Sequence, residues 1–174
     1  MKHQLIVTIL GADKPGILAE LANLVCDLNC NILDSRQAHY GLDFSFTMIL
    51  EGSISCITKA EFEIPRLCQK LDLLSMSKRT QKHSKQHLVH LADVEFQGKD
   101  AQGIVKGLTE FLSEHHIHIN AFRQKTTEST GTDKNVECKM VVSMPQELSL
   151  DKITPLFDAF LEQHHLCGSI VEKT

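Results

Sequence analysis

The feature of this sequence that most restricts its fold is an internal repeat. When residues 11–37 are compared without gaps with residues 98–124, eight of the 27 positions are identical, where ordinary composition gives about two by chance. The identical residues of the first copy are Gly11, Asp13, Gly16, Ile17, Leu21, Ile32, Arg36 and Gln37. Solenoid repeats are shorter and need three or more copies, so this long period indicates a duplicated small domain. The sequence therefore predicts domains at 1–80 and 91–174, joined by a polar, basic linker at 81–90.

Both copies carry the same order of predicted elements. Apolar alternation and turn residues predict strands at 5–10, 32–39, 43–51 and 75–80, and at 91–96, 117–125, 136–144 and 168–172. Apolar residues three and four apart predict helices at 17–28, after Thr58 as far as Leu74, at 103–115 and from 149 onward. The order βαββαβ predicts an α+β, ferredoxin-like unit with a four-stranded antiparallel sheet and two helices on one face.

Local signals predict where the helices of the first copy begin and end. Asp13 is expected to cap the first helix, with Pro15 in its first turn. Thr58-x-x-Glu61 has the spacing of a capping box for the second helix, and Pro65 would lie in the first turn of that helix or at a kink. Asn29 to Asn31 offers a left-handed stop for the first helix.

Composition indicates a globular protein of the cytoplasm. Hydrophobic residues make up 42 % of the chain and charged residues 23 %, and the net charge is −4, which disfavours a bulk nucleic-acid binder. The longest apolar runs are too short to span a bilayer, and the first residues lead directly into a strand without a secretory signal. We therefore expect a cytoplasmic protein that binds neither membrane nor nucleic acid directly.

Cysteine and histidine patterns predict no metal site and no cofactor. The six cysteines include no Cys-x-x-Cys and do not recur between the copies, so buried or half-buried free thiols are favoured over a disulfide framework. His115, His116 and His118 lie where a helix should end, and His83, His87 and His90 lie in or beside the linker. A surface or helix-terminus role is favoured over metal binding for both groups.

Catalytic motifs are absent from the sequence, which predicts a protein that is not an enzyme. There is no Gly-x-Ser-x-Gly, no phosphate-binding loop and no His-Glu-x-x-His. Asp13 with Arg36, or Asp100 with Arg123, would be the only acid and electrostatic partner to consider, and helix capping explains Asp13 more simply.

The turn at residues 11–16 suggests a binding site for a small carboxylate. A glycine-flanked turn from strand to helix exposes backbone N–H groups at a helix N-terminus, where the helix dipole favours an anion. Gly16 and Gly103 would allow close approach of a ligand. The alternative is that both glycines serve only the turn. In the second copy Gln102 replaces Pro15, which weakens the case for a ligand there.

The same residues carry a resemblance to a known family. The run Gly11 to Ile17, with Asn31 and Ile32 after the first helix, resembles the ACT domain, a module that senses small molecules. The run Asn29 to Arg36, the stretch from Phe44 to Ser53 and the run Lys78 to Thr80 are similar to stand-alone tandem ACT-domain repressors. The resemblance implies a negative transcriptional regulator of the glycine cleavage system. Such a regulator would contact a LysR-type activator, and a small amino acid such as glycine would modulate that contact.

The resemblance and the turn together define a set of expected ligand contacts. These are Gly11, Ala12, Asp13, Pro15, Gly16, Ile17, Asn31 and Ile32, with Gly98, Asp100, Gly103 and Ile104 as the second-copy equivalents. Unpaired sheet edges predict that the two domains pack together and that the chain forms a homodimer. Two alternatives remain open: an amino-acid-sensing regulatory subunit of a metabolic enzyme, and a structural adaptor without a ligand.

Overall fold

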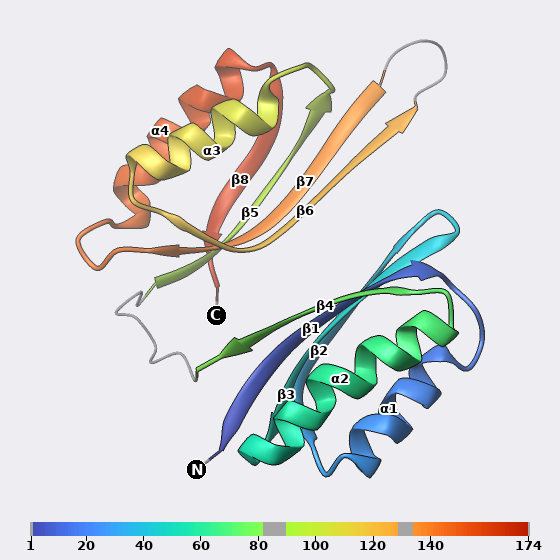
Figure 1. The fold of residues 1–174 in the computed structure, drawn as a ribbon. Helices are drawn as coiled ribbons and strands as arrows, with labels where there is room; N and C mark the ends of the chain where they lie inside the picture. Colours follow the sequence, from blue (N-terminus) through green and yellow to red (C-terminus); the bar gives the residue numbers. More distant parts are fainter. Residues whose placement is uncertain (1, 82–89, 129–133, 174) are drawn as a thin grey trace. The chain divides into compact units, whose positions relative to one another are not determined.

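The chain divides into two compact units, Met1–Ser84 and Lys85–Thr174, here called the first and the second unit. The structure is a computed structural model that describes residues 2–81, 90–128 and 134–173 (Figure 1). Nearly all of the predicted linker at 81–90 lies outside the described residues, as do His83 and His87.

Both units have the predicted order βαββαβ. The first contains β1 (His3–Ala12), α1 (Ile17–Asp27), β2 (Asn31–Tyr40), β3 (Asp43–Gly52), α2 (Ile54–Lys70) and β4 (Leu74–Thr80). The second contains β5 (His90–Lys99), α3 (Ile104–Glu114), β6 (His118–Glu128), β7 (Lys134–Met144), α4 (Leu150–Gln163) and β8 (Leu166–Glu172). The antiparallel sheets have the orders β2-β3-β1-β4 and β6-β7-β5-β8, which confirms the predicted fold class.

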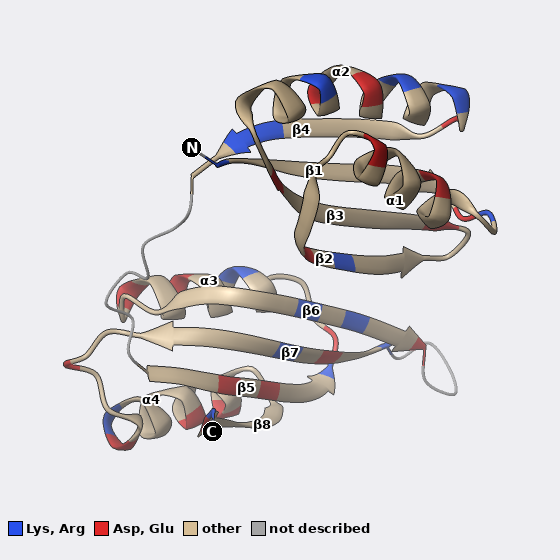
Figure 2. Cartoon of the chain, turned by 90° about the horizontal axis from the view of Figure 1, so that it is seen from below, with Lys and Arg blue, Asp and Glu red and all other residues tan. Residues whose placement is uncertain are grey.

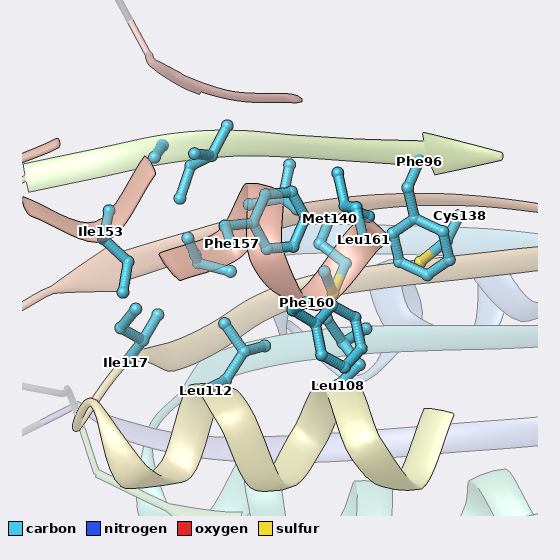
Figure 3. Packing of buried hydrophobic residues seen from close by; sticks show 14 of the residues in the cluster. Phe96, Leu108, Leu112, Ile117, Cys138, Met140, Ile153, Phe157, Phe160 and Leu161 are labelled. Atoms are coloured by element: carbon cyan, nitrogen blue, oxygen red, sulfur yellow. The ribbon is translucent and has the colours of Figure 1, made fainter. Parts of the chain in front are cut away.

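Each unit has its own hydrophobic core between its sheet and its pair of helices (Figure 1). In β1, alternate side chains point toward the helices, so Leu5, Val7 and Ile9 are buried. In the second unit the corresponding layer packs against α3 and α4, where Phe160 lies beside Leu108 (Figure 3). Burial of this apolar surface is the main favourable term in folding.

The first helix starts where its apolar stripe predicts, but its cap differs from the prediction. Helix α1 starts at Ile17, and its N-cap is Gly16 with φ 96°, so Asp13 is not the cap and Pro15 lies before the helix. A left-handed residue replaces the side-chain cap, and such a backbone conformation favours glycine. At the other end Asn29 is left-handed with φ 54°, which confirms the predicted stop.

The capping box predicted at Thr58 and Glu61 is also wrong. Helix α2 begins at Ile54, and its cap is Ser53, whose Oγ accepts a hydrogen bond from the backbone N–H of Cys56. Pro65 therefore lies inside the helix and not in its first turn. The buried stripe of this helix begins at Ile57, before Thr58, so Thr58 already lies inside the helix and cannot cap it.

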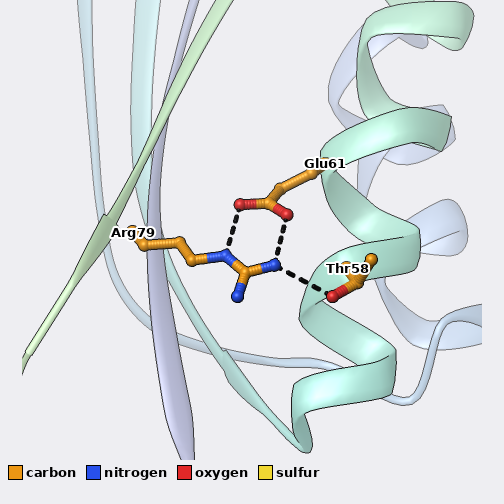
Figure 4. A network of polar contacts seen from close by, with 3 residues as sticks. All are labelled: Thr58, Glu61 and Arg79. Carbon is orange, nitrogen blue, oxygen red and sulfur yellow. Dashed lines mark hydrogen bonds and ion pairs between the residues drawn. The ribbon is translucent and has the colours of Figure 1, made fainter.

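Thr58 and Glu61 instead bind Arg79 of β4 (Figure 4). The Arg79 guanidinium donates two hydrogen bonds of 2.7 Å to the Glu61 carboxylate and one of 2.9 Å to Thr58 Oγ1. A bidentate pair of this kind fixes orientation as well as charge. It joins α2 to the outer strand of its sheet.

We expect Arg79→Ala to lower the melting temperature by a few degrees at pH 7 and by less at pH 3. The hydrogen bonds from Arg79 lower the pKa of the Glu61 carboxyl. The pair therefore stabilises the fold above the ordinary carboxyl pKa, and this stabilisation is lost as pH falls through the lowered pKa. Thermal unfolding at both pH values tests this. Arg66→Ala is the control, because its contact with Glu63 is 3.8 Å long and exposed; an equal effect in both variants would contradict the prediction.

None of the helices in the described parts of the chain is long and apolar enough to cross a membrane.

Candidate functional site

The loop between β1 and α1 presents an uncapped helix N-terminus. Within residues 2–81, no side chain makes a capping hydrogen bond at the start of α1. A Cβ placed on Gly16 would meet no heavy atom of the described chain within 4 Å. The first-turn N–H groups of a helix attract anions, so this open position suits a carboxylate group.

The second unit repeats this loop closely. Gly103 is the N-cap of α3 with φ 94°, again without a side-chain cap among the described residues and with open space where a Cβ would lie. The loop is held in the same way in both units: the Asp13 N–H donates to the Leu42 carbonyl at 3.0 Å, and the Asp100 N–H donates to the Lys134 carbonyl at 2.7 Å. The repeated identities therefore encode a repeated backbone conformation.

The other glycine of each turn has a packing role. A Cβ on Gly11 would lie 2.6 Å from Leu73 Cδ2, and one on Gly98 would lie 2.8 Å from Leu166 Cδ2. A side chain at either position would therefore force Leu73 or Leu166 out of its packed position. Gly11 and Gly98 thus let the chain before β4 and the start of β8 pack against β1 and β5, whereas Gly16 and Gly103 face open space.

The aspartates of the two loops have different partners. Asp13 Oδ2 lies 3.5 Å from His39 Nδ1 at the end of β2, whereas Asp100 Oδ2 accepts a 3.3 Å hydrogen bond from Thr126 Oγ1. Arg36 lies 3.8 Å from Asp34 instead of pairing with Asp13. The acid and electrostatic pair considered from the sequence is therefore not the pair that the fold brings together.

Asn31 and Ile32 do not lie beside the β1–α1 loop of their own unit. Gly11 is level with Phe44 at the start of β3, whereas Ile32 is level with Leu50 near its end. At about 3.4 Å per residue, six residues of strand separate the two groups by about 20 Å. The expectation that they line one region is wrong within a unit, because α1 returns the chain to the far end of the sheet before β2 begins.

The outer strands β2 and β6 are exposed along nearly their whole length. Nine of the ten residues of β2 and ten of the eleven of β6 are exposed, including the apolar Leu33 and Phe122. Each is an edge strand in its sheet, so each has one row of backbone groups that pairs with no other strand of the described residues. Long exposed edges of this kind are templates for pairing with another strand.

The face of the second sheet that points away from the helices is strongly charged. Lys139 of β7 lies 3.4 Å from Glu95 of β5 and 3.6 Å from Glu137, and Arg123 and Lys125 follow on β6 (Figure 2). The sequence interpretation did not include this cluster. The signal was the alternation of charged and apolar residues in 93–97 and 136–142.

The six cysteines are free. Cys68 and Cys138 are buried, and Cys30 and Cys56 are partly buried, as expected, but Cys26 and Cys167 are exposed. Cys26 lies on the outward side of α1, away from its buried residues, and Cys167 points to the open face of its sheet. In the described ranges no group of three or more His, Cys, Asp or Glu side chains is placed to hold a metal ion.

Comparison with known sequences places the first unit in a family. Residues 3–78 match the ACT domain. The chain is 29 % identical over 170 residues to the glycine cleavage system transcriptional repressor of Escherichia coli, a match that covers 97 % of this chain and 90 % of the relative. A UPF0237 protein of Methanococcus maripaludis is 36 % identical over 69 residues, which is 40 % of this chain and 74 % of that protein.

Comparison with solved structures covers both units. A crystal structure assigned to a glycine cleavage system transcriptional repressor matches 100 % of this chain and 99 % of its own, with a TM-score of 0.79 and 29 % identity. A protein of Galdieria sulphuraria has the same TM-score at 16 % identity and full coverage of both chains. The second match shows that the tandem fold is kept at low sequence identity.

Proposed function

The first unit of this chain matches the ACT domain, and from that premise we propose that the chain is a negative regulator of transcription for the glycine cleavage system. The observation that carries the proposal is a similarity that runs through both units to a protein named as that repressor. A regulator of this kind acts in the cytoplasm by binding, and has no catalytic step of its own.

We propose that the ligand is a small amino acid, glycine first among them, bound at the loop before α1. The uncapped N–H groups suit its carboxylate. Glu20 lies in the first turn of α1 and Asp13 in the loop, and both would repel a simple anion but attract an ammonium group. A zwitterionic amino acid carries both a carboxylate for the N–H groups and an ammonium group for Glu20 and Asp13, whereas acetate carries only the carboxylate.

A homodimer would explain why Asn31 and Ile32 lie so far from this loop. The end of β2 touches the loop, because Asp13 contacts His39. Antiparallel pairing of the β2 edges of two chains would place the start of one β2, with Asn31, beside the end of the other. Asn31 and Ile32 of one chain would then lie near the β1–α1 loop of the other. Light scattering at micromolar concentration tests this, and a monomeric mass would contradict the homodimer.

The proposed protein partner is a LysR-type activator and not DNA. The net charge of −4 disfavours contact with the phosphate backbone, whose recognition depends on lysine and arginine. The second unit would supply contact surface, since its charged sheet face offers both signs for pairing with a protein.

Calorimetric titration with glycine tests the ligand, with acetate as the matched control that lacks the ammonium group. Glycine should bind and acetate should not; alanine and serine then measure how much side chain the site accepts. No heat of binding with millimolar glycine would remove the sensor part of the proposal.

Capture of a purified LysR-type activator by the protein tests the regulator part separately. Co-purification of an enzyme subunit instead would favour the alternative of a regulatory subunit.

A further inference from the structure

Two thiols of the first unit converge on a single glycine. Cys30 lies just before β2, and Cys56 lies in the first turn of α2. A Cβ on Gly52, at the end of β3, would lie 3.3 Å from Cys30 Sγ and 3.2 Å from Cys56 Cβ. The two cysteines are 26 residues apart in sequence, yet their side chains approach the same point, which is open only because residue 52 has no side chain.

The surroundings of Cys56 favour its thiolate. Ser53 Oγ–H donates a 3.0 Å hydrogen bond to Cys56 Sγ, and this contact lowers the pKa of the thiol. Ser55 Oγ lies 2.9 Å from Ser53 Oγ and can donate to it, which leaves the Ser53 proton for the sulfur. Lys59 adds a nearby positive charge, and the helix N-terminus acts in the same direction.

The surroundings of Cys30 keep it protonated until its neighbour reacts. Burial raises the pKa of the Cys30 thiol, and the charge of the Cys56 thiolate raises it further. Oxidation of Cys56 to a neutral species removes that charge, so the second contribution disappears. The remaining four thiols differ. Burial raises the pKa of the Cys68 thiol and raises that of Cys138 to about 11, and Cys26 and Cys167 are exposed.

We propose that Cys56 and Cys30 form an oxidisable pair, in which hydrogen peroxide oxidises Cys56 and Cys30 then closes a disulfide. The Cys56 thiolate attacks one peroxide oxygen, the O–O bond breaks, and the sulfenic acid forms with release of hydroxide, which becomes water on protonation. The Cys30 sulfur then attacks the Cys56 sulfur; the S–S bond forms, the S–O bond breaks and a second water leaves. Two thiols lose two electrons in total, and one peroxide gains them.

The bond would join the turn before β2 to the start of α2. Cys30 directly precedes Asn31, the first residue of β2, so the disulfide would tether the start of this edge strand to α2. This modification site is independent of whether the protein binds an amino acid.

Peptide mapping of the full chain after mild peroxide treatment tests the pair. The free-thiol content should fall from six by two, and a cross-linked peptide should contain Cys30 and Cys56; a thiol reductant should restore both thiols. In Cys30→Ser, Cys56 should stop at the sulfenic acid and be trapped by dimedone. In Cys56→Ser, the thiol of Cys30 should remain free at the same dose.

Gly52→Ala provides a variant in which both thiols are present. Its methyl group would occupy the point where they converge, so we expect the cross-link to be lost while dimedone still labels Cys56. Cys26→Ser should leave the cross-link unchanged. The proposal is overturned if the cross-linked peptide does not form, if it forms equally in Gly52→Ala, or if Cys26 or Cys167 is oxidised as fast as Cys56.

Discussion

Replacing Gly16 with leucine is expected to abolish the calorimetric binding of glycine to the first unit. The open space at Gly16 lies at the N-terminus of α1, and a leucine side chain would fill the position proposed for the ligand carboxylate. The sequence alone suggests a small cost to stability unless residue 16 has positive φ. The observed φ of 96° means that any side chain strains the backbone, at a cost of about 1–2 kcal/mol.

Gly103→Leu separates the loss of ligand from the loss of stability. Gly103 has φ 94° and the same open surroundings, so the two substitutions impose nearly equal strain. Both variants should melt lower, by about 4–8 °C for each kcal/mol in a domain of this size, but only Gly16→Leu should lose the main glycine response. If both variants lose binding in proportion to their loss of stability, the glycines serve the turn and not a ligand.

Phe157→Ala is expected to lower the free energy of unfolding of the second unit by about 3–5 kcal/mol. Phe157 is 1 % exposed and lies in the core of the second unit (Figure 3). Its ring centroid lies 6.0 Å from that of Phe111 and 6.2 Å from that of Phe160. Removal of the ring leaves a cavity that the surrounding strands cannot fill. Urea unfolding followed by circular dichroism measures the loss.

Phe62→Ala is the matched control for this substitution. Phe62 also lies on a helix, α2, but it is 71 % exposed, and exposed positions change stability by about 0.5 kcal/mol or less. Because the first unit has a separate core, Phe157→Ala should not weaken the core contacts within that unit. Similar small losses in both variants would show that the ring of Phe157 is not needed for the packing of its core.

The candidate site was only partly visible in the sequence. The turn at 11–17 was found because its glycines repeat at 98 and 103 and because glycine has few other reasons to recur there. The different roles of Gly11 and Gly16 were not visible. The packing role of Gly11 follows from its contact with Leu73, and the role of Gly16 follows from its positive φ. Both depend on the folded backbone and not on the residue type.

The approach of Cys30 to Cys56 and the contacts of Arg79 could not be predicted from the sequence either. Cys30 and Cys56 have no spacing that marks them as a pair, and Thr58 and Glu61 matched a local capping signal although their partner is Arg79 of β4. The same side chains can match a local capping motif and yet bind a residue far away in the sequence. A long-range partner can be identified only when the strand register is known.

By itself, the sequence determined the duplication, the order of elements and the apolar face of each helix and strand. These properties depend on residues that are near one another in the chain, because periods of 2 and 3.6 residues arise within single elements. Tertiary structure decided which groups share a site: it placed Ile32 about 20 Å from Gly11 and brought Cys30 to Cys56 around Gly52. Such distances depend on how strands pair and return, and they involve residues that no local period connects.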